Sequence, residues 1–267
     1  MTESGIVNMK ANSSSNVVEI TAELNDLVTI VVVTSPIPSH PDTCLIDNTL
    51  SRLRYHFPTA RMVVNCDGVR PELAHRKHAY DDYLYRLQLL GRTGLDFETV
   101  TWFNHTHQST MFYQTLEAVT TPLVLFSEHD LPLFTDREID WHMIARAILS
   151  GAIDLVRFML TESIHPEHLY LYDGPHPEYP DLFRQRQYSG WTHIASTDMY
   201  RRLFAGYDRR ARLMLEHYLP RIIEPHPERC RMASYIPNII AAQRIYHTDG
   251  RSGDPWLEGN RVYPITP

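Results

Sequence analysis

The residues best placed to do chemistry lie directly after Leu123-Val-Leu-Phe126, an apolar run typical of a buried strand. They are Glu128, His129 and Asp130. Side chains alternate along an extended chain, so we expect Glu128 and Asp130 on one side and His129 on the other. Neighbouring carboxylates repel each other unless a cation compensates them, and oxygen ligands suit Mg²⁺ or Mn²⁺. The segment therefore predicts a divalent metal site or, alternatively, an acidic loop in which Asp130 caps a turn.

A second group of candidate ligands lies near the C-terminus, in residues 246–255. His247 could complete a metal site as a neutral imidazole. Arg251 carries a fork of donors that matches a diphosphate. Gly250 and Gly253 would let this loop move over a bound ligand, whereas the alternative is a solvated terminal loop.

Further candidates are set apart by their surroundings. Arg157 interrupts the apolar run 155–159, where an unpaired charge would be costly, so we expect it to meet a carboxylate or a phosphate near the site. Trp191 and His193 could form the floor of a sugar pocket, because aromatic faces stack on sugars. Trp191 could equally be a core residue.

The elements that must position these residues alternate between short β-rich runs and helical patterns. Val28–Val33 is apolar or β-branched throughout, as in a strand buried on both faces. The other expected strands are 61–65, 97–103, 123–126 and 155–159, and the expected helices cover about 42–57, 72–90, 108–119, 136–147 and a stretch after 197. This alternation predicts an α/β fold, a mostly parallel sheet with helices on both faces. Ligands then bind beyond the carboxyl ends of the strands, at 34–40, 66–69, 127–133 and 160–162.

Length and composition restrict the organisation. We expect residues 1–26 to form a loose polar tail and residues 27–267 to form one domain, with a loop or hairpin over 165–180. The net charge is 25 − 32 = −7, which disfavours sequence-independent binding to nucleic acid. Three cysteines without a C-x-x-C pair argue against a disulfide framework and fit a reducing, cytoplasmic location. No apolar stretch is long enough for a membrane span, and no signal peptide is recognised.

Other common sites are disfavoured by missing motifs. The chain has no G-x-G-x-x-G after its first strand, no Walker A sequence and no G-x-S-x-G elbow. His105 and His107 could ligate a metal, but their spacing in a loop is more typical of ordinary surface histidines.

Together these pieces resemble the GT-A class of glycosyltransferases, which use nucleotide-sugar donors. The resemblance covers about residues 28–256 and rests on five segments: Val-Val-Val-Thr-Ser, Val-Val-Asn-Cys-Asp-Gly, Leu-Phe-Ser-Glu-His-Asp-Leu-Pro-Leu, Gly-Trp-Thr-His-Ile-Ala-Ser and His-Thr-Asp-Gly-Arg. The third segment stands in the place of the family's D-x-D motif, with Glu128 instead of the first aspartate. The resemblance implies a GT-A-like, Rossmann-type mixed sheet, with a donor half at 27–160 and an acceptor half at 161–267 that includes the C-terminal active-site loop.

The resemblance also implies roles for individual residues. Thr34, Ser35 and Pro36 would line the nucleoside pocket. The other donor-binding residues would be Asp67 at the base or ribose, Glu128 at the ribose or sugar, Arg251 at the diphosphate, and His129. Asp130 would bind Mn²⁺ or Mg²⁺, with Glu128 and His247 as further candidate ligands.

The implied reaction moves a hexosyl or pentosyl group to an acceptor hydroxyl, with inversion of configuration. It requires a base to deprotonate the acceptor. Glu216, Glu162 and Asp198 are candidates for this base, Arg157 would act near the site, and Trp191 with His193 would bind the acceptor. The acceptor itself is left open between a glycan, a small molecule, a protein and a modified nucleobase.

Two alternative functions share this kind of fold. A sugar-phosphate nucleotidyltransferase usually has a glycine-rich, basic loop after the first strand, whereas this chain has Ser-Pro-Ile-Pro-Ser-His. A non-catalytic nucleotide-sugar-binding protein would have no need of the Glu-His-Asp segment. Five arginines form either a solvated helix end or a patch for an anionic acceptor: Arg201, Arg202, Arg209, Arg210 and Arg212.

Overall fold

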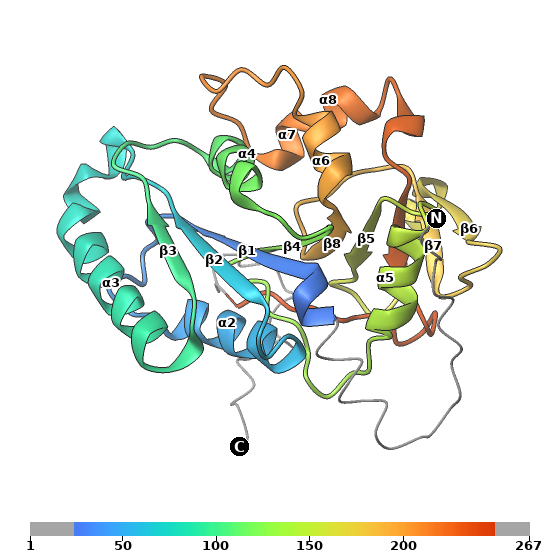
Figure 1. The fold of residues 1–267 in the computed structure, drawn as a ribbon, viewed down its shortest axis with the longest axis horizontal. Helices are drawn as coiled ribbons and strands as arrows, with labels where there is room; N and C mark the ends of the chain where they lie inside the picture. The colour runs from blue at the N-terminus through green and yellow to red at the C-terminus, as the bar shows by residue number, and fades with distance from the viewer. Residues whose placement is uncertain (1–23, 249–267) are drawn as a thin grey trace, which may run out of the picture.

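A nine-stranded mixed sheet runs through the computed structural model, which describes residues 24–248 (Figure 1). Its strand order is β3-β2-β1-β4-β8-β5-β9-β7-β6. The fold class predicted from the sequence, a mixed and mostly parallel α/β sheet, is confirmed.

The first half of the sheet contains parallel strands connected by helices. Its elements are β1 (Val28–Thr34), α2 (Cys44–His56), β2 (Arg61–Cys66), η1 (Pro71–Arg76), α3 (Lys77–Leu90), η2 (Gly91–Leu95), β3 (Glu98–Thr101), α4 (Gln108–Ala118) and β4 (Leu123–Glu128). β1 pairs with β2 on one side and with β4 on the other, and every residue of β1 is buried. A strand covered on both faces has no polar face, which is why its sequence is continuously apolar or β-branched.

The second half interrupts the parallel order. Its elements are α5 (Trp141–Leu149), β5 (Leu155–Phe158), η3 (Pro166–Leu171), β6 (Tyr172–Pro175), β7 (Leu182–Gln185), β8 (His193–Ser196), α6 (Thr197–Leu203), α7 (Leu215–Tyr218), α8 (Pro220–Ile223), η4 (Pro227–Arg229) and β9 (Met232–Tyr235). β8 lies between β4 and β5 and is antiparallel to both. β9 is parallel to β5, and the hairpin β6–β7 completes the edge. β4 and β5 therefore point the same way without being neighbours.

Helices cover both faces of the sheet, as predicted (Figure 1). Alternate β1 residues divide between two cores: Ile30 packs with α2, α3 and α5, whereas Val31 packs with α4, α6 and α7. The two cores fix the strand ends from both sides, so the loops that leave these ends have defined positions.

One expectation about an element end is corrected, and one contact precedes the expected domain. Asn25, within the expected tail 1–26, is buried and accepts hydrogen bonds from the amides of Thr59 (3.0 Å) and Ala60 (2.9 Å). The helix expected from Asp136 starts only at Trp141, because the Asp140 side chain caps it by accepting from the Met143 amide at 2.9 Å. Residues 1–23, and so most of the expected tail, lie outside the described part.

Candidate active site

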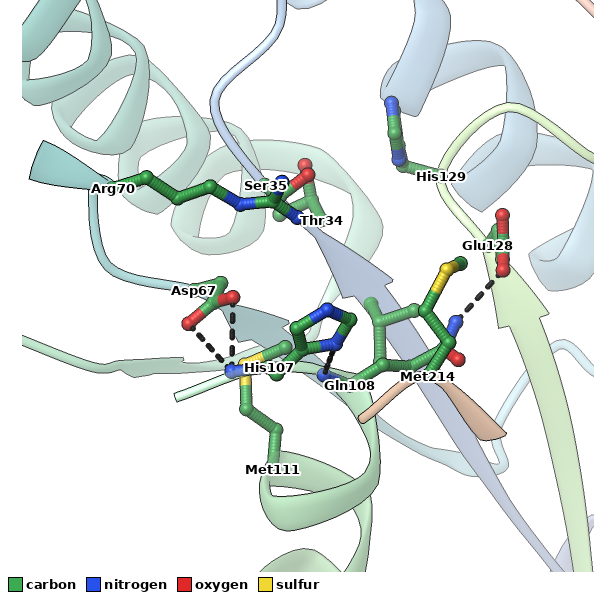
Figure 2. Close-up of a pocket in the computed structure, with 11 residues that line it drawn as sticks. Thr34, Ser35, Asp67, Arg70, His107, Gln108, Met111, Glu128, His129 and Met214 are labelled. Atoms are coloured by element: carbon green, nitrogen blue, oxygen red, sulfur yellow. Dashed lines mark hydrogen bonds between the residues drawn. The ribbon is translucent and has the colours of Figure 1, made fainter. Parts of the chain in front are cut away.

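The carboxyl ends of β1, β2 and β4 surround a cavity of about 280 Å³, which we call the first cavity (Figure 2). It lies where the sheet rule places a ligand. Its lining residues are Val33, Thr34, Ser35, Asp67, Arg70, His107, Gln108, Met111, Glu128, His129 and Met214. Five of these were predicted from the sequence as donor-binding residues: Thr34, Ser35, Asp67, Glu128 and His129. His107 was considered only as a possible metal ligand. Pro36 does not line it, and Arg251 lies outside the described residues.

Asp67 is buried at the floor of the first cavity, where it holds the loop 104–107. Its carboxylate accepts hydrogen bonds from the amides of Gly68 (2.8 Å), Thr106 (2.7 Å) and His107 (3.1 Å). It also lies 2.8 Å from Nδ1 of His105. Asp67 therefore organises the loop, in addition to any contact with a ligand.

His107 has an unusual backbone conformation at the edge of the same cavity. Its φ is 74°, a region that residues with side chains rarely adopt. The bonds from Asp67 hold it there, and its own Nδ1 accepts from the Gln108 amide at 3.0 Å at the start of α4. Burial, and next the charge of His105, lower the pKa of His107. Such strain persists only where the surroundings enforce it, and it is commonly found at functional sites.

Gln108 joins two parts of the site that are distant in the sequence. Its Nε2 donates to Glu128 Oε1 at 2.7 Å (Figure 2), and its Oε1 accepts from the amide of Leu215 at 2.8 Å. The buried side-chain amide of Gln108 therefore makes one hydrogen bond with β4 and one with α7. This residue and Arg70 were not identified from the sequence.

Arg70 supplies a cation to the first cavity. Figure 2 shows its side chain extending toward Thr34 and Ser35. It follows the Cys66-Asp-Gly-Val69 segment, which the sheet rule had already selected, so its position in the chain was the available signal.

Asp130 departs from the predicted alternation. β4 ends at Glu128, and a turn in which the Leu131 amide donates to Glu128 O at 3.3 Å follows. Glu128 and His129 therefore line the first cavity, whereas Asp130 is only 2% exposed and does not. The expectation that Glu128 and Asp130 share one side is wrong, because alternation holds only while the chain stays extended.

Asp130 instead meets His247. Their Oδ2 and Nε2 atoms are 3.5 Å apart, and the Thr248 amide donates to Asp130 O at 3.1 Å. Two residues 117 positions apart, both predicted as metal ligands, are thus neighbours. Within residues 24–248 no group of three or more His, Cys, Asp or Glu side chains has the geometry of a metal site.

A larger cavity of about 860 Å³, the second cavity, opens between β5, η3 and α7. Arg157, Trp191 and Glu216 line it together, as do Tyr172 and Tyr188. The segment 214–217 separates the two cavities, since Met214 lines the first whereas Glu216 and His217 line the second.

Glu216 is held in place within the second cavity. Its Oε1 accepts from the Gly190 amide at 2.6 Å. Among the described residues, its other oxygen accepts no hydrogen bond. One oxygen therefore fixes the orientation while the other remains available for chemistry.

Arg157 projects from β5 into the second cavity and has only neutral partners in the described residues. Its Nη2 donates to Tyr172 Oη at 2.9 Å and to Ser234 Oγ at 3.2 Å, and its guanidinium lies 4.7 Å from the Trp191 ring centre. Burial lowers its pKa, while Tyr172 and Glu216 act in the opposite direction. Of the two partners expected from the sequence, a carboxylate or a phosphate, no carboxylate of residues 24–248 lies within ion-pair distance.

Three other predicted residues lie away from both cavities. His193 is fully buried, with Nδ1 2.6 Å from Trp191 O and Nε2 bonded to Tyr200 Oη, so its expected contact with an acceptor is wrong. Glu162 forms an ion pair with Arg137 at 2.8 Å on the surface. Asp198 is exposed in α6. Neither of these two acids lines a cavity described here, which leaves Glu216 as the candidate base.

Comparison with solved structures identifies the architecture. The chain is similar to S. aureus TarS, with a TM-score of 0.54 and 12% identity over 83% of this chain and 36% of that one. It is also similar to residues 1–349 of TarS in complex with UDP-GlcNAc, with a TM-score of 0.50 and 12% identity over 85% of this chain and 59% of that one. The chain has the GT-A fold.

At this level of identity the likeness shows the GT-A fold alone. The chain spans 36% of the TarS structure and 60% of its residues 1–349. No protein-family model and no curated protein sequence matches it. No helix between residues 24 and 248 combines the length and the apolarity that crossing a bilayer would take.

Proposed function

We propose that this protein is a glycosyltransferase that moves a sugar from a nucleoside-diphosphate-sugar to an acceptor hydroxyl. One observation carries the proposal: in a GT-A fold, a cavity at the carboxyl ends of the strands shares the wall 214–217 with a larger cavity that contains an oriented carboxylate. The first cavity would take the donor and the second the acceptor. The division into a donor half and an acceptor half remains part of this proposal.

The first cavity has the groups that a nucleotide requires. Thr34 is fixed by a hydrogen bond with Tyr83 Oη at 3.1 Å, and Arg70 brings a cation beside it. Glu128, oriented by Gln108, offers an oxygen to sugar or ribose hydroxyls. Solved TarS complexes contain UDP and UDP-GlcNAc, which supports a nucleotide-sugar in this place.

Asp130 and His247 fit a divalent metal. One carboxylate and one imidazole 3.5 Å apart are compatible donors for Mn²⁺, and Mg²⁺-type ions usually take their other ligands from phosphates and water. A small protein donor set is therefore suitable for an ion bound jointly with a diphosphate. When bound, such an ion neutralises charge that develops on the leaving diphosphate.

Glu216 is the proposed base of an inverting transfer. With its Oε1 held by Gly190, the other oxygen would accept the proton of the acceptor hydroxyl as that oxygen bonds to the sugar carbon. The nucleoside diphosphate leaves with the electron pair of the broken bond. Trp191, which lines the same cavity, would stack on the acceptor.

The test is release of nucleoside diphosphate from a panel of nucleotide sugars with and without Mn²⁺. We expect slow hydrolysis of one donor, a large loss in Asp130→Asn and His247→Gln, and full activity in Asp136→Asn, an exposed aspartate of the same loop. Hydrolysis at an unchanged rate in the presence of a chelator and in Asp130→Asn would contradict a role for the metal. Pyrophosphate release from a nucleoside triphosphate and a sugar phosphate would favour the nucleotidyltransferase alternative. Tight UDP binding without turnover would favour the non-catalytic alternative.

A further inference from the structure

The second cavity contains a buried charge, Arg157, that has no counter-ion among residues 24–248. Arg157 is 8% exposed, and among the described residues its Nε has no hydrogen-bond partner. No carboxylate of residues 24–248 forms an ion pair with it; its hydrogen-bond partners are the hydroxyls of Tyr172 and Ser234. A desolvated guanidinium is costly unless an anion or a full set of hydrogen bonds compensates it.

The acidic groups of this cavity do not fill that role. The negative charge of Glu216 acts to raise the pKa of Arg157, against the larger effect of burial, but Glu216 makes its short hydrogen bond with Gly190 instead. Glu224 also lines the cavity without an ion pair to Arg157. The effect of the uncompensated cation extends into the core, where burial and then the charge of Arg157 keep the pKa of His193 low.

Other features of the second cavity suit a charged carbohydrate. Trp191 lies against the Arg157 guanidinium, and Tyr170 adds a second, exposed aromatic face to the lining. Three histidines, whose ring nitrogens can hydrogen-bond to an anion, also line the cavity: His165, His168 and His217. The arginine stretch that the sequence offered as an anionic patch is less suited, because Arg201, Arg202, Arg209 and Arg210 each pair with an acidic side chain.

We infer that the second cavity binds an acceptor that carries an anionic group, a phosphate or a carboxylate, which Arg157 holds while a hydroxyl of the same molecule lies beside Glu216. That the bound molecule is an acceptor rests on the proposed function, whereas binding of an anion by Arg157 does not depend on it. A planar guanidinium fork matches the paired oxygens of both anions.

Binding of small probes in the absence of any donor tests the inference. Quenching of tryptophan fluorescence measures the affinity of each probe. We expect glucose 6-phosphate or glucuronate to bind at least about tenfold more tightly than glucose, because a hydrogen bond to a charged group is involved. The ratio between the two anionic probes distinguishes a phosphate from a carboxylate acceptor. Arg157→Gln should abolish the difference from glucose, whereas Arg157→Lys, which keeps the charge but loses the fork, should retain part of it.

Two controls separate the possible failures. Arg186→Gln, which removes an exposed arginine outside the cavity, should bind the probes as the unmodified protein does. UDP binding measured on every variant reports the first cavity and correct folding. Equal affinity for glucose and its anionic analogues would overturn the inference, as would loss of anion binding in Arg70→Gln but not in the Arg157 variants. Anion binding through Arg157 without any donor hydrolysis would support the site and defeat the glycosyltransferase proposal.

Discussion

The amide of Gly190 donates to Oε1 of Glu216 at 2.6 Å, and this approach depends on the missing side chain at position 190. A Cβ placed there would lie 3.1 Å from Cγ and Oε1 of Glu216 and 3.2 Å from its Cδ. The Gly190 backbone is not in the left-handed region, so the contact with Glu216 is what favours glycine. The residue that precedes Trp191 thus sets the position of the proposed base.

Gly190→Ala should move the Glu216 carboxylate by a few tenths of an ångström. We expect kcat for glycosyl transfer to fall about tenfold while KM for the donor stays unchanged, since misplacement of a catalytic group is costly. Gly94→Ala is the matched control, because a Cβ at Gly94 meets nothing within 4 Å. Equal kcat values in the two variants would show that the position of Glu216 does not matter for the reaction.

Gly68→Ala should disturb the first cavity through the backbone. A Cβ at position 68 would lie 2.2 Å from the carbonyl carbon of Asn104 and 2.6 Å from the amide nitrogen of His105, so the loop held by Asp67 must move. We expect weaker UDP binding by about tenfold and a loss of roughly 1–3 kcal/mol in the free energy of unfolding. Calorimetry and denaturant titration measure the two effects. Unchanged UDP affinity would place the nucleotide away from this loop.

Gln108→Ala should disturb the positions of residues at both cavities. It leaves Glu128 without its donor at 2.7 Å and the Leu215 amide without its acceptor at 2.8 Å. The buried Leu215 amide left without a partner costs about 1–3 kcal/mol, and Glu128 loses the group that orients it, so both stability and kcat should fall. Gln88→Ala, at an exposed position of another helix, should change neither. A loss of stability with normal kcat would restrict Gln108 to a structural role.

Two histidines with lowered pKa values predict acid sensitivity. Burial lowers the pKa of His193 and of His56 to about 4, from an ordinary value of 6.5. Below pH 6.5 each of these two histidines binds a proton in the unfolded chain but not in the native protein. The stability present at neutral pH is therefore lost as the pH falls from about 6.5 to about 4. Between pH 7 and pH 5 we expect the free energy of unfolding to drop on the order of 2 kcal/mol for each histidine.

Denaturant titrations at several pH values measure this loss, and His56→Gln should reduce the slope by about one proton. NMR signals of the two rings should stay those of neutral imidazole down to pH 5. Midpoints near pH 6.5 for both signals would contradict the prediction.

The sequence predicted the first half of the fold closely, because fully buried strands such as β1 leave continuous apolar runs and the intervening helices have clear stripes. The place of β8 between β4 and β5 was not predictable in this way, since alternation gives the order of elements along the chain and not their order in the sheet. For the same reason the sequence pattern around Trp191 predicts a ligand contact for His193, whereas its bond to Tyr200 in the structure makes it a core residue.

The candidate site was predicted where the chemistry follows a strand end and missed where a contact crosses the fold. Glu128 ends β4 and lines the first cavity, and Asp130 lies 3.5 Å from His247, whereas the metal that they would hold stays a prediction. Gln108 carries no sequence signal, since its function depends on Glu128 and Leu215 meeting it from different elements. Arg70 directly follows the selected segment 66–69, but arginines in loops are too common to be singled out.

The shared wall 214–217 has a consequence for how the specificity of this protein could be altered. The first cavity is built mainly from loops of the parallel half, whereas the second is built from η3, the segment before β8, and α7. Exchanging residues 165–172 would therefore change what the second cavity accepts and leave the first intact. A replacement of the wall would act on both, because Leu215 is joined through Gln108 to Glu128. The ligand preferences of the two cavities can therefore be altered independently, except by changes in residues 214–217.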